Sequence, residues 1–261
     1  SLLICDPLTP INELIDDEQP AIPVNTDANQ VATQFSDYDW ITAPVVDENN
    51  ILLGRITIDD VVDIIREQAE HQAMGAAGLD EDEDLFSPVP RAAKRRALWL
   101  GINLLTAFLA SWVIGRFEAT LQQVVALAVL MPIVASMGGV AGTQVLTLMV
   151  RGIALGQVGV GNLRALIAKE VLVGVLNGLV WALVVGVVCA LWFQDAKLGL
   201  VIAGAMTINL VAAALAGVLV PITLKRMNID PALAGGVVLT TFTDVIGFLS
   251  FLSLGTLILL K

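Results

Sequence analysis

The chain has 261 residues, of which 56% are hydrophobic and 15% charged, and its mean hydropathy is +0.80. These proportions exclude an ordinary soluble enzyme. Residues 1–90, here called the acidic head, hold 20 of the 25 acidic residues and 2 of the 14 basic ones, a net charge of −18. Residues 91–261 carry +7 and no basic stripe with interleaved aromatics. We therefore expect metal cations as partners and no nucleic acid.

The acidic head is predicted to be a small α/β module. The chain begins at Ser1 without a methionine or a leader pattern, so we expect a piece whose N-terminal part is missing. Residues 1–22 are interpreted as the tail of a preceding copy of the same module. Residues 23–71 are interpreted as a whole copy with the order strand, helix, strand, strand, helix. Its elements are expected at 28–38 (helix), 43–47 and 51–56 (strands) and 57–70 (helix).

Residues 72–96 are predicted to join the head to the membrane. They contain five consecutive acidic residues at 80–84, which are interpreted as a solvated linker. Basic residues at 91, 94, 95 and 96 follow and indicate an interfacial helix that touches anionic lipid.

Residues 97–261 are predicted to cross the membrane five times. Long apolar runs occur at 97–115, 119–150, 171–194, 198–224 and 231–260, and each is about as long as the roughly 20 residues that a spanning helix needs. The second run contains Pro132 and a pair of glycines at 138–139, where we expect a tilt, a kink or partial unwinding.

The basic residues of the loops predict the orientation. If the head is cytoplasmic, nine Lys and Arg lie on the inner side and three, Arg116, Lys197 and Lys261, on the outer side. This bias predicts a cytoplasmic head and an outward C-terminus.

Asp244 is the charged residue inside the fifth run. A carboxylate at the centre of a spanning helix costs roughly 2.5–3.5 kcal/mol on insertion scales and is functional by default. With helical spacing, its face would hold Gly236, Thr240, Gly247 and Phe251, which suits a pore wall. The plain alternative is an aspartate hydrogen-bonded inside the bundle to Asn177, Asn209 or Gln144.

Two sets of motifs carry a family resemblance. Residues 54–60 (GRITIDD) are similar to the end of a CBS domain, and residues 43–47 stand where that domain has its core strand. Pro132 with residues 138–144, residues 228–233 before the fifth run and residues 241–247 within it resemble the MgtE family of magnesium channels. The resemblance covers nearly the whole chain. It implies a five-helix pore domain, a partial CBS pair, a plug-like interfacial helix and a homodimer.

The resemblance also implies roles for individual residues. Asp244 would line the pore and set the preference for Mg²⁺, with Thr240 near the same ion. Asp39, Asp60 and Asp63 match acidic positions that bind Mg²⁺ in the cytosolic part of the family. CBS domains also bind adenine nucleotides, which Thr57 and Asp60 would meet.

The expected function is therefore movement of Mg²⁺ across the cytoplasmic or inner membrane, with the acidic head sensing Mg²⁺ and closing the pore. No enzymatic activity is expected. A proton-coupled divalent-cation carrier, an intramembrane aspartyl protease assembled across subunits and a purely regulatory scaffold stay open as alternatives. Co²⁺, Ni²⁺ and Mn²⁺ stay open as ions.

Overall fold

The computed structural model describes residues 21–79, 86–159 and 161–260. Contacts divide the chain into two units, residues 1–69 and 70–261, which are described separately below. Three features predicted above lie outside the described residues: the body of the 1–22 tail, the acidic run at 80–84 and Lys261.

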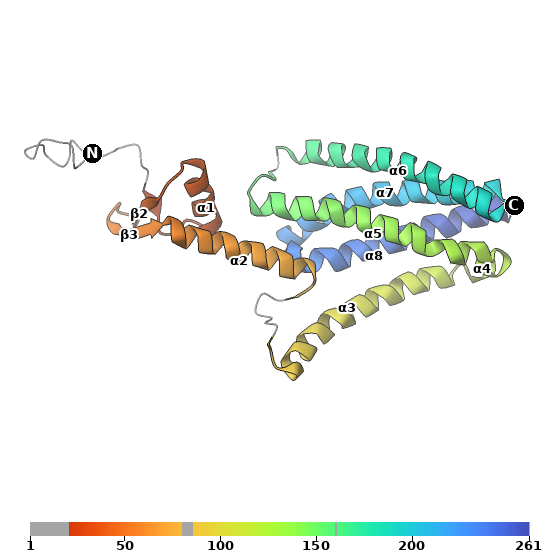
Figure 1. Cartoon of the computed structure of the whole chain (residues 1–261), viewed down its shortest axis with the longest axis horizontal. Helices are drawn as coiled ribbons and strands as arrows, with labels where there is room; N and C mark the ends of the chain where they lie inside the picture. Colours follow the sequence, from red (N-terminus) through yellow and green to blue (C-terminus); the bar gives the residue numbers. More distant parts are fainter. Residues whose placement is uncertain (1–20, 80–85, 160, 261) are drawn as a thin grey trace, which may run out of the picture. The chain divides into compact units, whose positions relative to one another are not determined.

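The first unit has the predicted order of elements (Figure 1). They are β1 (Ile22–Pro23), α1 (Ala28–Asp37), β2 (Thr42–Val46), β3 (Leu52–Thr57) and the start of α2 (Ile58–Ala76). The sheet has the order β1-β2-β3, in which β1 and β2 are parallel and β2 and β3 antiparallel. Apolar side chains from the helices and the sheet form one small core, whose buried members are Ile22, Val31, Ala32, Phe35, Trp40, Ala43 and Val61.

Local hydrogen bonds explain where the elements of the head begin and turn. Asp27 caps α1 by accepting a hydrogen bond from the backbone N–H of Asn29 at 2.9 Å. Between β2 and β3, the Asp47 carboxylate accepts from the backbone N–H of Ile51 at 2.8 Å, and Asn50 takes a left-handed conformation with φ 61°. The last helix continues to Ala76, six residues beyond the predicted end at residue 70.

The second unit contains the five predicted spanning helices, which confirms the membrane fold class. The helices long and apolar enough to cross a membrane are α3 (Val89–Gly115), α5 (Val125–Ala154), α6 (Leu163–Phe193), α7 (Ala196–Arg226) and α8 (Pro231–Leu259). Short helix α4 (Glu118–Gln123) precedes α5.

Three of the spans begin earlier than their apolar runs, α7 by two residues and α3 and α6 by eight. Helix α3 starts at Val89, so the basic residues 91–96 belong to its first turns and not to a separate helix. Helix α6 starts at Leu163 and includes Arg164 and Lys169. An apolar run marks the part of a helix that suits hydrocarbon, whereas the hydrogen-bonded helix continues into the polar interface, where basic side chains are tolerated.

The second apolar run is interrupted at a different place from the one expected. The helix is unbroken through Pro132 and residues 138–139, and the interruption lies at Val124, between α4 and α5. Partial unwinding at Pro132 was therefore the wrong expectation. Neighbouring helices tolerate a proline within a spanning helix because they satisfy the backbone group that it frees.

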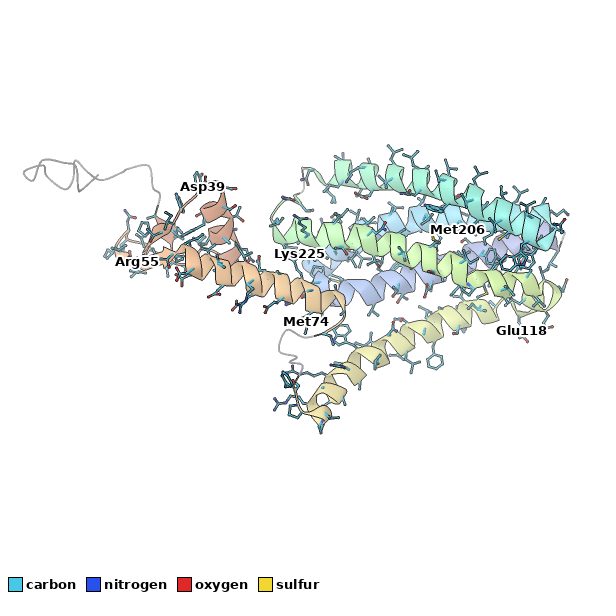
Figure 2. The ribbon with its side chains drawn as sticks, viewed as in Figure 1. Asp39, Arg55, Met74, Glu118, Met206 and Lys225 are labelled. Atoms are coloured by element: carbon cyan, nitrogen blue, oxygen red, sulfur yellow. The ribbon has the colours of Figure 1, made fainter. Side chains whose placement is uncertain are left out.

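Helix α7 lies at the centre of this unit, where it packs on α5, α6 and α8. Figure 2 marks Met206 on this helix, and its side chain is fully buried. Three glycines of α6 (Gly174, Gly178 and Gly186) are buried against α7, as expected for small residues that let membrane helices approach closely. Helix α3 packs mainly on α8.

Candidate functional site

Asp244 lies midway along α8 and is half-buried. Among the described residues, no hydrogen bond or ion pair involves its carboxylate. Of the partners that a purely structural role would need, Asn209 donates to the carbonyl oxygen of Val134 at 2.9 Å and Asn177 is exposed on α6. Gln144 lines the same cleft as Asp244. The carboxylate is therefore left available to a group outside the described chain.

A cleft of about 510 Å³ lies between α5 and α8 and contains Asp244. From α8 it is lined by Thr240 and Asp244. From α5 it is lined by small and polar residues with one valine, namely Ala135, Ser136, Gly139, Val140, Thr143 and Gln144. The charged residue in this lining is a carboxylate, so the charge that the lining presents is negative.

Hydroxyl groups on both walls are oriented by the helix backbone. Thr143 donates its hydroxyl proton to the carbonyl oxygen of Gly139 at 2.8 Å, and Thr240 donates to that of Gly236 at 3.0 Å. Because each proton is used within its own helix, the oxygen lone pairs of both residues are left to accept further hydrogen bonds. A hydrated cation offers water protons as donors, so this wall suits a metal ion that keeps its water shell.

A second cavity of about 470 Å³ adjoins the cleft at Thr143 and Thr240, which line both. It extends toward the start of α8 and is lined there by Pro231 and Ala232, and by Arg151 near the end of α5. The two cavities form a row of openings along α8, in which Thr240 lies between Asp244 and the start of the helix.

The predicted polar face of α8 is shorter than expected. Gly236, Thr240 and Asp244 line the two cavities, but Gly247 and Phe251 are buried and do not. A methyl group on Gly247 would lie 2.8 Å from the Asn209 side chain, so this residue faces α7. Helical spacing alone places all five of these positions on one stripe of α8. The packing of α7 decides which part of that stripe stays open.

The three predicted sensing residues are exposed in the head. Asp39 occupies the turn after α1, with φ 52°, and Figure 2 shows it there. Asp60 and Asp63 lie on α2. In the part of the chain that the structure describes, no three His, Cys, Asp or Glu side chains lie close enough together to hold a metal ion. One head by itself therefore does not present a preformed metal cage there.

Asp60 already has a structural partner. Its carboxylate accepts hydrogen bonds from both the backbone N–H and the hydroxyl of Thr57, each at 3.0 Å. The resemblance to CBS domains assigned these two residues to an adenine nucleotide, and in this structure they bind each other.

The sequence did not indicate the place of two polar residues, Ser136 at the wall of the cleft and Asn209 behind it. Ser136 lies one turn from Gly139 and two turns from Thr143 on α5, a spacing that could have indicated a polar stripe. Asn209 was considered only as a partner of Asp244, and its buried position behind the cleft depends on three helices that the sequence does not place.

Comparison with known proteins agrees with this architecture. The family model MgtE, described as a divalent cation transporter, matches residues 131–254, and the CBS domain model matches residues 6–67. A protein of Bacillus subtilis named magnesium transporter MgtE is 32% identical over 98% of this chain. Proteins of the same name from Enterococcus faecalis and Thermus thermophilus are 32% and 33% identical over 98% and 99% of it.

The chain spans about half the length of these relatives, namely 56% of the first two and 58% of the third. The relatives are named as transporters and not as enzymes. The membrane domain of this chain therefore belongs to the MgtE family of divalent cation transporters, and a CBS domain precedes it.

Proposed function

We propose that this chain conducts Mg²⁺ across the cytoplasmic membrane through the cleft between α5 and α8. The observation that carries the proposal is the carboxylate of Asp244, which faces the cleft without a partner among the described residues. A charge inside a membrane domain is costly unless it meets an opposite charge or water. The names of the three relatives support Mg²⁺ as the ion.

The chemistry of the cleft suits a hydrated ion. Mg²⁺ requires octahedral oxygen ligands and gives up its water reluctantly, so it is typically held through one or two carboxylates. In a homodimer, two copies of Asp244 would supply a charge of −2 and balance one divalent ion. The hydroxyls of Thr143 and Thr240 would accept hydrogen bonds from its water shell.

The proposed orientation places the acidic head in the cytoplasm and the C-terminus outside. The nine basic residues on the proposed inner side include the first turns of α3, where they would contact anionic lipid headgroups.

Conduction is tested by reconstituting the 261-residue chain into liposomes and measuring Mg²⁺ uptake for Asp244→Asn. The matched control is Asp195→Asn, which changes the aspartate that caps the start of α7. This change should be tolerated because asparagine caps a helix equally well. We expect Asp244→Asn to abolish most of the uptake and the control to retain it. Equal Mg²⁺ uptake in both variants would refute the proposal.

A proton-coupled carrier is the second candidate, since an unpaired membrane carboxylate can also carry a proton. Electrical recording distinguishes the two mechanisms. A channel gives unitary currents whose reversal follows the Mg²⁺ gradient alone, whereas a carrier shows uptake that depends on the pH gradient.

We further propose that the head senses Mg²⁺ and closes the pore. The net charge of −18 on residues 1–90 opposes close approach of two heads, and divalent cations bound between them would relieve this repulsion. Asp39, Asp60 and Asp63 are exposed, and Asp60 would bind the ion while its carboxylate also accepts from Thr57. Closure requires tighter ion binding in the closed arrangement than in the open one.

The sensing proposal is tested by recording open probability at low and high internal Mg²⁺ in the reconstituted protein. The triple variant Asp39→Asn, Asp60→Asn and Asp63→Asn should lose the closing response. Asp37→Asn, an exposed aspartate at the end of α1, serves as the control and should keep it. An unmodified protein whose open probability ignores internal Mg²⁺ would contradict the proposal.

A further inference from the structure

Asn209 lies where α5, α7 and α8 meet. It belongs to α7, and only 1% of it is exposed. Its amide Nδ2 donates a hydrogen bond to the backbone carbonyl oxygen of Val134 on α5 at 2.9 Å. This bond joins the central helix of the membrane domain to one wall of the cleft.

Two glycines receive the Asn209 side chain from either side. A methyl group added to Gly138 of α5 would overlap the amide nitrogen, and one added to Gly247 of α8 would lie 2.8 Å from it. The backbones of α5 and α8 therefore both touch the same carboxamide. Because protein interiors are close-packed, the size of this group fixes how near the two helices can come.

The same two helices form the walls of the cleft. Gly138 is followed directly by Gly139, which lines the cleft, and Gly247 lies one helical turn after Asp244. The distance between α5 and α8 at Asn209 therefore sets the distance between the cleft walls in the next layer of side chains. A change in the volume at residue 209 changes the space beside the carboxylate.

Packing alone does not explain an amide at this position. The Oδ1 atom of Asn209 is buried and has no hydrogen-bond partner among the residues that the structure describes. An unsatisfied buried acceptor is unfavourable, whereas an apolar side chain would have no polar atom to satisfy. Buried acceptors of this kind are commonly satisfied by an ordered water molecule.

We propose that Asn209 is a positioning residue for ion selection. It holds α5 and α8 at the separation that fits hydrated Mg²⁺ beside Asp244, and its Oδ1 accepts a hydrogen bond from a water molecule in the layer behind the ion. The inference rests on the conduction proposed above. Ca²⁺ is larger than Mg²⁺ and accepts more flexible coordination, so a loosened cleft admits it more readily.

The test compares Mg²⁺ and Ca²⁺ uptake in liposomes for Asn209→Leu, which keeps the number of side-chain heavy atoms but is bulkier and removes the hydrogen bond. The control is Asn177→Leu, which removes an exposed asparagine from α6. We expect Asn209→Leu to lower the ratio of Mg²⁺ to Ca²⁺ uptake by about tenfold, the scale of one lost buried hydrogen bond. The control should leave the ratio unchanged.

A second pair of variants separates positioning from folding. Asn209→Ala opens a void and should also lower the ratio, whereas adding Gly247→Ala partly refills the space left by the carboxamide and should restore part of the ratio. A merely structural role would lower Mg²⁺ and Ca²⁺ uptake by the same factor, in proportion to the folded yield. An unchanged ratio in both Asn209→Leu and Asn209→Ala overturns the inference.

Asp244→Asn is measured in parallel so that the two proposals can fail separately. If Asp244→Asn leaves Mg²⁺ uptake intact, conduction past this carboxylate is refuted, and the role assigned to Asn209 is refuted with it. If Asp244→Asn abolishes uptake while the Asn209 variants keep the normal ratio, only the role of Asn209 is refuted.

Discussion

Thr57 and Asp60 bind each other at the start of α2, where one carboxylate oxygen of Asp60 accepts from both the backbone N–H and the hydroxyl of Thr57. This contact is one half of a capping box, in which the side chain of the third helical residue accepts a hydrogen bond from the residue that precedes the helix. The carboxylate proposed to sense Mg²⁺ therefore also fixes the start of the helix that leads out of the head.

Removing this cap should destabilise the head in two measurable steps. Thr57→Val removes only the hydroxyl and should lower the unfolding temperature slightly, while Asp60→Ala removes both hydrogen bonds and should lower it further. Trp40 is a suitable fluorescent reporter, since it is buried in the head and contacts Phe35. The other four tryptophans would be replaced by phenylalanine in the background. Equal unfolding temperatures for the two variants would contradict this assignment.

Acid should weaken the turn between β2 and β3. The hydrogen bond from the backbone N–H of Ile51 holds the pKa of Asp47 below its ordinary value. A lowered pKa in the folded state stabilises the head above the unfolded pKa of about 3.9, and this contribution is lost as the pH falls through the folded value. Asp47→Ala should therefore destabilise the head at pH 7 but have a smaller effect near pH 3.

The same Trp40 reporter measures that difference in urea titrations at the two pH values. Glu48→Ala, one residue further along the same exposed turn, is the control for general effects of charge. A destabilisation by Asp47→Ala that is equally large at both pH values would exclude the ionised carboxylate as its source.

Replacing the hydroxyl of Thr240 should slow Mg²⁺ uptake. Thr240→Val keeps the shape of the side chain but removes an acceptor from the cleft, so we expect a decrease of about two- to tenfold. Thr241→Val is the matched control, because Thr241 also donates to the carbonyl oxygen of Val237 but lines neither cavity. If the control slows uptake as much as Thr240→Val, the effect comes from the helix and not from the cleft.

The contact between α6 and α7 should be sensitive to a single methyl group. A Cβ on Gly199 would lie 2.5 Å from the carbonyl oxygen of Gly186 and 2.9 Å from the Cβ of Ala190. We expect Gly199→Ala to destabilise the membrane domain by about 1–3 kcal/mol, the usual cost of overpacking. Gly101→Ala on α3, where no atom lies within 4 Å, should be neutral or slightly stabilising. Unfolding of both variants in mixed detergent micelles measures the difference.

The sequence alone predicted the membrane fold class because its signal is local. A bilayer has a fixed thickness and requires each segment to satisfy its own backbone, so length and hydropathy identify five spans without knowledge of their neighbours. The ends of the spans were less accurate. Helix α6 extends to Leu163 through Arg164 and Lys169, because a helix is defined by its hydrogen bonds and does not stop at the first charge.

The acidic head was predicted equally well in its order of elements. Period-two and helical spacing located the two longer strands and both helices, and the Asp59 and Asp60 pair marked the start of α2. The end of α2 at Ala76 was missed.

The identity of Asp244 as an unusual residue followed from the sequence, since one carboxylate in an apolar run is visible without any structure. Which residues surround it was decided by tertiary packing. The carboxamide of Asn209 occupies the space beside Gly247 and closes the part of the α8 stripe that follows Asp244. Thr143 and Ser136 of α5 complete the open part of the stripe, which lines the cleft. Side chains from separate helices meet only when the helices pack, and helical spacing within one segment carries no record of where its neighbour lies.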